Sequence, residues 1–110
     1  MRWLVVLACC LAFSGCTREA PQAVSRVVDD YGCGSCHTIP GIAGATGRTG
    51  PPLVEYGRQV YVAGVAPNTP EMLTRFILDP QAVDPRSAMP DLRLTRAEAS
   101  LLASYLGSGP

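Results

Sequence analysis

The chain has 110 residues, and its nine arginines balance nine acidic side chains, so the formal net charge at pH 7 is zero. A balanced charge gives no electrostatic case for nucleic-acid binding. The length suits one small domain, and domains of this size often need a stabilising group besides their apolar core.

The first 15 residues have the pattern of a secretory signal peptide. Arg2 precedes an apolar run over residues 3–13, which is too short for a membrane span of about 20 apolar residues. The run ends in Leu-Ala-Phe-Ser-Gly-Cys, which resembles the lipobox of bacterial lipoproteins. That resemblance implies cleavage before Cys16 and lipidation of this residue. The alternatives are an ordinary cleaved signal with an incidental Cys16, or an uncleaved anchor.

The signal pattern predicts a compartment and a domain organisation. Several acyl chains on one residue would give stable attachment to a membrane. We therefore expect a lipid-anchored protein on the periplasmic face of a bacterial membrane, with a soluble periplasmic protein as the alternative. Residues 16–22 are expected to form a tether, and residues 23–110 a single domain.

A first helix is predicted immediately before the most informative motif of the chain. Val24, Val27, Val28 and Tyr31 recur at helical spacing, and Gly32 ends the pattern. The sequence Cys-Gly-Ser-Cys-His follows at residues 33–37 and indicates attachment of a c-type haem. In this interpretation both thiols bond to the haem, and the adjacent imidazole becomes an axial ligand of its iron.

The haem interpretation assigns Cys33 and Cys36 to covalent attachment and His37 to the iron. Two alternatives are a redox dithiol and a zinc site. A thioredoxin-like dithiol is expected beside a βαβ pattern, and the sequence has none. A structural zinc site usually needs four protein ligands, whereas the motif supplies three.

The middle of the chain is predicted to be loops, and a second helix follows them. Eight of the eleven glycines lie at residues 32–64, which favours loops packed against a ligand. Thr69 and Pro70 are typical of a helix N-cap and first position. Asp79-Pro80 ends this helix, and its expected buried face consists of Met72, Leu73, Phe76 and Ile77.

Met89 is the predicted second axial ligand. It lies outside any periodic pattern, in a segment that Pro85 and Pro90 would stiffen, and a thioether is a soft ligand suited to iron in an electron-transfer site. The alternative is a gap-filling core methionine. Met72 lies on a helix face and is expected in the core.

A third helix completes an all-α prediction. Thr95 and Glu98 are spaced as a capping box, and Gly107 is expected to close the helix. Its apolar stripe consists of Ala97, Leu101, Leu102, Tyr105 and Leu106. No alternating pattern is long enough to predict a sheet.

Together these motifs resemble class I cytochromes c, specifically the small bacterial monohaem type, and the chain is similar to the cytochrome c domain attached to subunit II of some terminal oxidases. The resemblance covers residues 23–107 and implies three main helices and glycine-rich loops wrapped around one covalent haem. Asp79-Pro80, followed nine residues later by Met89, fits the spacing of that family. Leu102 and Tyr105 fall where the last helix of the family packs against the first.

The same resemblance implies roles for two further residues. Gly-Pro-Pro-Leu at residues 50–53 resembles the Gly-Pro-x-Leu segment of the family. The carbonyl of Pro51 would accept a hydrogen bond from the nitrogen of His37 that does not bind iron. Tyr-Gly-Arg at residues 56–58 matches the place of an arginine near a haem propionate, which would be Arg58.

Two departures from the family pattern bear on packing and on the propionates. Many relatives carry glycine where the first helix crosses the last, and this chain has Val24 and Ser25, which predicts a looser or shifted crossing. Many also carry a tryptophan that reaches a propionate where this chain has Phe76. The remaining propionate partners are Arg58, Tyr61 and Asn68.

The expected function is a membrane-tethered electron carrier with one covalent haem c, no catalytic residue of its own and no small-molecule substrate. It would take electrons from a quinol-oxidising complex or a dehydrogenase and pass them to a terminal oxidase or similar respiratory acceptor. One alternative is a haem peroxidase or a gas or redox sensor, if Met89 dissociates easily. Others are a thiol–disulfide oxidoreductase and a structural subunit of a larger complex.

Overall fold

The structure, a computed structural model, describes residues 18–110. The predicted signal segment 1–15 and Cys16 lie outside the described residues. The elements in chain order are α1 (Gln22–Tyr31), η1 (Cys33–Ser35), η2 (Tyr56–Arg58), β1 (Tyr61–Val62), β2 (Ala66–Pro67), α2 (Pro70–Leu78), α3 (Pro80–Val83) and α4 (Arg96–Gly107).

The end of the expected tether packs on the rest of the chain. The N–H of Ala20 donates a hydrogen bond to the carbonyl oxygen of Gly41 at 2.8 Å, and α1 already begins at Gln22. Ala20 and Gln22, which lie in the expected tether, therefore take part in a backbone contact and in α1.

Helix α1 has the predicted buried face and the predicted end. Val24, Val27 and Val28 are buried. Gly32 follows with φ 68°, a left-handed conformation that glycine adopts without strain, and its N–H donates back to the carbonyl of Asp29. This reversal ends the helix one residue before Cys33.

Helix α2 begins as predicted. The Oγ1 of Thr69 accepts a hydrogen bond from the N–H of Met72 at 3.1 Å, and Pro70 is the first helical residue. Leu73 and Ile77 are buried, whereas Met72 and Phe76 are only partly buried against the core.

A short helix that the sequence did not predict follows at once. Asp79 ends α2 and also caps α3, because its Oδ1 accepts a hydrogen bond from the N–H of Ala82 at 3.1 Å. Pro80 opens α3 and is among the most deeply buried side chains of the described residues. A helix of four residues is too short to show periodicity, so only its cap could have indicated it.

A second unpredicted element is the hairpin of β1 and β2. Tyr61 pairs with Pro67 and Val62 with Ala66 in antiparallel register. The chain reverses at Ala63 (φ 51°) and Gly64 (φ 71°). Strands of two residues have no alternation to detect, which is why the sequence pattern missed them.

Helix α4 has the predicted capping box. Thr95 Oγ1 accepts a hydrogen bond from the N–H of Glu98, and the Glu98 carboxylate accepts one from the N–H of Thr95. Ala97 is exposed, so its expected place on the apolar stripe is wrong. The buried face, at the helical spacing of three and four residues, consists of Ala99, Leu102, Ala103 and Leu106.

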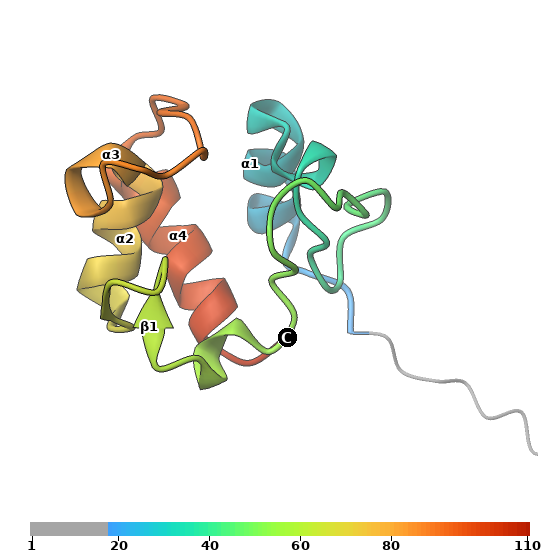
Figure 1. Cartoon of the computed structure of the whole chain (residues 1–110). Coiled ribbons are helices and arrows are strands. Elements are labelled where there is room, and N and C mark those ends of the chain that lie inside the picture. The colour runs from blue at the N-terminus through green and yellow to red at the C-terminus, as the bar shows by residue number, and fades with distance from the viewer. Residues whose placement is uncertain (1–17) are drawn as a thin grey trace, which may run out of the picture.

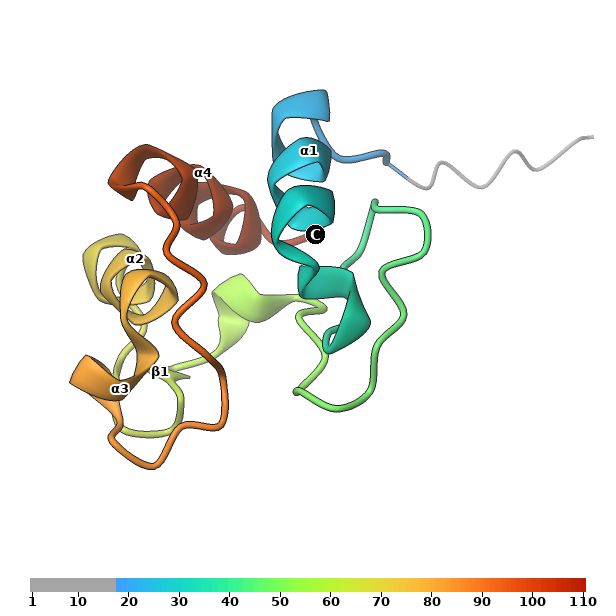
Figure 2. The ribbon, with the colours of Figure 1, turned by 90° about the horizontal axis from the view of Figure 1, so that it is seen from above.

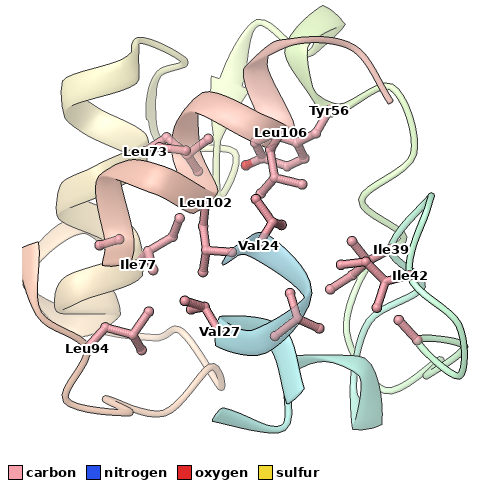
Figure 3. Packing of buried hydrophobic residues seen from close by; sticks show 14 of the residues in the cluster. Val24, Val27, Ile39, Ile42, Tyr56, Leu73, Ile77, Leu94, Leu102 and Leu106 are labelled. Atoms are coloured by element: carbon pink, nitrogen blue, oxygen red, sulfur yellow. The ribbon is translucent and has the colours of Figure 1, made fainter. Parts of the chain in front are cut away.

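Helix α4 is the central element, because it packs against both α2 and α1 (Figures 1 and 2). Figure 3 shows Val24 of α1 beside Leu102 and Leu106 of α4, with Leu73 and Ile77 of α2 beyond them. Val24 is only 1% exposed. The Val24 side chain is therefore packed where α1 meets α4.

Figure 1 shows two sides of the molecule: α2 and α3 lie on one side, and α1 with the glycine-rich segment after η1 lies on the other. Ile39, Ile42 and Ala45 are buried within this glycine-rich segment. The hydroxyl of Tyr105 donates a hydrogen bond to the carbonyl of Pro40 at 2.6 Å. This contact connects the loop to α4.

Candidate functional site

A cavity of about 370 Å³ lies between the two sides of the molecule. This volume is within the range of small-molecule and cofactor sites. Residues of the segment after α1 (teal in Figures 1 and 2) and of the segment after α3 (orange) both line the cavity. Most of the wall is apolar, with side chains that include Val28, Leu53, Leu73, Phe76, Ile77, Leu92, Leu94, Leu102 and Leu106.

The predicted attachment motif lines this cavity with all three of its functional side chains, Cys33, Cys36 and His37. The single turn of η1 places them there. The N–H groups of Cys36 and His37 both donate to the carbonyl of Cys33, at 3.2 and 3.0 Å. This turn directs side chains three and four residues apart to one side of the chain.

Glycines let the following loop wrap closely around the motif. A Cβ on Gly47 would lie 2.5 Å from the carbonyl oxygen of Ser35, and a Cβ on Gly50 would lie 2.5 Å from Cε1 of His37. The N–H of Gly50 also donates to the carbonyl of Cys36 at 2.7 Å. The glycine-rich composition therefore has a specific use here, because any larger residue would displace the imidazole or the turn.

The hydrogen bond expected between His37 and Pro51 is present. The Nδ1 of His37 lies 2.7 Å from the carbonyl oxygen of Pro51. A carbonyl oxygen only accepts, so Nδ1 must carry the proton of this bond. The lone pair of the neutral imidazole is then on Nε2, which is the tautomer that a metal-binding histidine requires.

Met89 also lines the cavity and is half-buried, whereas Met72 is absent from the cavity wall. The segment that carries Met89 is held by its own hydrogen bonds. The N–H of Met89 donates to the hydroxyl of Ser87 at 3.3 Å, and the N–H of Ser87 donates to the carbonyl of Asp84 at 2.9 Å. The thioether and the motif therefore contribute to the wall of one cavity although they lie far apart in sequence.

The structure does not bring Arg58 to this cavity. The Arg58 side chain is 78% exposed, and its guanidinium pairs with the carboxylate of Glu55 at 3.2 Å. Tyr61 is exposed as well. Asn68 donates to the backbone carbonyls of Tyr56 and Gln59 at 3.1 and 2.9 Å, as expected of a turn residue. The three residues considered for the propionates therefore all lie outside the cavity wall.

Other polar residues, which the sequence interpretation did not assign to the site, line the cavity instead. They are Thr49, Tyr56, Asp84, Ser87 and Tyr105. Tyr56 is buried, and this burial raises the pKa of its hydroxyl, partly offset by a hydrogen bond with the backbone of Ala63. The sequence signal that could have indicated a role for Tyr56 in the site is its place in the Tyr-Gly-Arg segment, next to Gly57. The Asp84 carboxylate pairs with Arg86 at 3.4 Å, and no sequence pattern indicated its position.

These residues fit a covalently attached haem better than the two alternatives for the motif. Burial raises the pKa of the Cys33 thiol, whereas a redox-active cysteine needs a lowered pKa. Within residues 18–110, no three His, Cys, Asp or Glu side chains cluster closely enough to hold a metal ion. An apolar cavity with two free thiols, an imidazole whose Nδ1 is bonded to a backbone carbonyl, and a thioether suits a porphyrin held through sulfur, nitrogen and thioether ligands.

In the part of the chain that the structure describes, no helix has the length and apolar character needed to cross a bilayer. Comparisons with protein-family models, with curated proteins and with solved structures found no match to this chain.

Proposed function

We propose that this protein carries single electrons through one covalently attached haem c, with His37 and Met89 as axial ligands. One observation supports this proposal above the others. Both thiols of the attachment motif, the imidazole of His37 and the thioether of Met89 line a single apolar cavity. Met89 is the one methionine of residues 18–110 on this wall, because Met72 does not line the cavity.

Each residue of the site would have a defined task. Cys33 and Cys36 would hold one edge of the haem through thioether bonds. Pro51 keeps the proton of His37 on Nδ1 and so leaves Nε2 free to bind iron. Met89 would supply the soft sixth ligand from the opposite segment. Haem iron bound by histidine and methionine exchanges single electrons at a raised potential.

The cavity wall would protect this centre from water. Leu73 and Leu102 are buried beside the cavity, and Phe76 covers a further part of it. Phe76 cannot donate a hydrogen bond. We assign contact with the propionates to the polar groups of the wall, with Tyr56 as the first candidate, in place of Arg58.

The proposal extends to fold class, location and partners. It assigns the chain to the class I cytochromes c, as a lipid-anchored carrier on the periplasmic face of a bacterial membrane. It would accept electrons from a quinol-oxidising complex and deliver them to a terminal oxidase or similar acceptor. Redox encounters of this kind bury little surface and dissociate quickly. No catalytic residue is needed for this task.

The test is expression in a host with a periplasmic haem-attachment system. We expect a red protein whose mass equals the processed chain plus one haem and whose cysteines at 33 and 36 resist thiol labelling. The reduced protein should show c-type absorption bands. A colourless product with the mass of the polypeptide alone would refute the proposal.

Two methionine variants test the axial ligand. Met89→Leu should abolish the weak sulfur-to-iron absorption band of the oxidised protein, whereas Met72→Leu should retain it, because Met72 is absent from the cavity wall. Leucine has a volume close to that of methionine, so packing changes little in either variant. A five-coordinate spectrum of the parent protein would instead favour the peroxidase or sensor alternative.

A further inference from the structure

We infer that Gln81 is a positioning residue that holds the Met89 segment closed over the cavity and so limits the access of external ligands to the iron. The inference rests on the proposed function. It extends that function from the ligands themselves to the side chain that controls how often one of them leaves.

The contacts of Gln81 carry the inference. Its side-chain Nε2 donates a hydrogen bond to the carbonyl of Met89 at 2.7 Å and a second to the carbonyl of Ser87 at 3.0 Å. The amide NH₂ group has two hydrogens, so both bonds form at the same time. One side chain therefore holds the main chain at the proposed ligand and again two residues before it.

Gln81 is attached to a firm support. It follows Pro80, which is almost completely buried, and it lies in the only turn of α3. The start of α3 is capped by the Asp79 carboxylate, and Asp79 N–H donates to the carbonyl of Arg75 in α2. We call the two hydrogen bonds of the Gln81 side chain the clamp. The clamp connects the Met89 segment to α2 and, through α2, to α4.

Few other contacts hold the segment. Within the described residues, the remaining hydrogen bonds of residues 84–89 are internal to residues 80–89. They run from Ser87 N–H to the Asp84 carbonyl, from Asp84 N–H to the Pro80 carbonyl, from Arg86 N–H and Nε to the Asp84 carboxylate, and from Met89 N–H to the Ser87 hydroxyl. Ala88 and Pro90, on either side of Met89, are exposed. Without Gln81, the Met89 backbone would keep only the hydrogen bond from its own N–H to the Ser87 hydroxyl, among the hydrogen bonds seen within residues 18–110.

A clamp of this kind changes the population of an open state. If haem is bound as proposed, an external ligand would reach the iron only in molecules whose Met89 has moved away, so its apparent affinity would be proportional to the open fraction. Removing both hydrogen bonds raises that fraction by about tenfold, if each bond has the usual modest net value. The iron ligands themselves are unchanged in such a variant.

The experiment measures imidazole binding to the oxidised holoprotein by visible spectroscopy. We expect Gln81→Ala to bind imidazole about tenfold more tightly than the parent. Gln81→Glu should do so at least as strongly, because a carboxylate of the same size cannot donate to either carbonyl. Gln59→Ala is the matched control, since Gln59 is exposed and no hydrogen bond of its side chain is seen among residues 18–110.

Amide hydrogen exchange supplies a readout that does not depend on added ligand. The amides of Ser87 and Met89 should exchange faster in the Gln81 variants, while the amides of α1 keep the rate of the parent. A purely structural role for Gln81 would lower global stability in urea and leave imidazole affinity unchanged.

The outcomes separate this inference from the function on which it rests. If the parent lacks the sulfur-to-iron band, the proposed function fails whatever Gln81 does. If the parent shows the band and both Gln81 variants bind imidazole like the parent, the inference about Gln81 fails alone.

Discussion

The hydroxyl of Tyr31 donates a hydrogen bond to the Oε2 of Glu98 at 2.9 Å, and this contact joins the last turn of α1 to the first turn of α4. The same carboxylate oxygen accepts the backbone N–H of Thr95 at 2.8 Å. The capping group of the final helix is therefore also the tie to the helix that leads into the attachment motif. Cys33 follows Tyr31 by two residues, so this tie helps to set where the motif begins.

The Glu98 contact predicts an acid-dependent loss of stability. Hydrogen bonds from the Thr95 backbone and then from the Tyr31 hydroxyl hold the pKa of Glu98 below its ordinary value of 4.5. The unfolded chain then takes up this proton first as pH falls. The contribution is full above about pH 4.5 and is lost as pH falls through the lower, folded-state pKa.

The measurement is the urea midpoint of the parent and of Glu98→Gln, from neutral to acidic pH. We expect the variant to be less stable at neutral pH and the difference to shrink in acid. Glu55→Gln is the control, because Glu55 forms only an exposed ion pair with Arg58. A difference that stays constant across the pH range would contradict the prediction.

Gly50→Ala should prevent correct seating of the histidine. The new Cβ would lie 2.5 Å from Cε1 and 2.8 Å from Nδ1 of His37, so the ring or the loop must shift and the contact of the ring with Pro51 is disturbed. We expect most of the purified protein to lack haem, which is measured as a low haem absorbance per milligram of protein. Gly107→Ala is the matched control, since no atom lies within 4 Å of its added Cβ, and it should keep the haem absorbance of the parent.

Arg58→Ala should leave the proposed haem site unchanged. The guanidinium is exposed and pairs with Glu55, and an exposed pair contributes at most about 1 kcal/mol. The visible spectrum and the reduction potential should therefore match those of the parent. A clear fall in potential or in haem retention would show that Arg58 turns toward the propionates once the haem is attached.

Thr69→Ala should destabilise the protein by about 1 kcal/mol, the usual cost of losing an N-cap. The Thr69 hydroxyl accepts the N–H of Met72 at 3.1 Å, and alanine leaves that donor unpaired in the first turn of α2. Thermal or urea unfolding measures the loss. Thr69→Ser retains the acceptor oxygen, so its stability should remain close to that of the parent.

The ends of the long helices could be predicted because their signals are local. Gly32, the Thr69-Pro70 pair and the Thr95–Glu98 box each act within one turn of the chain. Helix α3 could not be predicted in this way, since four residues carry no periodicity. The hairpin could not be predicted for the same reason. Its turn also places a non-glycine residue, Ala63, at positive φ, which the sequence does not indicate.

The candidate site divides along a similar line. The motif residues and Met89 could be proposed from sequence because their side-chain chemistry is unusual at those positions. The position of the Arg58 side chain could not be predicted in this way, because Arg58 forms an ion pair with the exposed Glu55 three residues earlier. The role of Gln81 could not be predicted from the sequence, because it depends on two backbone carbonyls that come near its side chain only in the folded segment.

The partner of His37 at residue 51 is a main-chain oxygen, and this has a consequence for mutational scanning. Every residue type supplies the same carbonyl, so no exchange of side chain can delete the acceptor itself. Sensitivity at this position would report the course of the peptide backbone. The imidazole proton is thus governed by the shape of a loop, which a single substitution alters only by bending that loop.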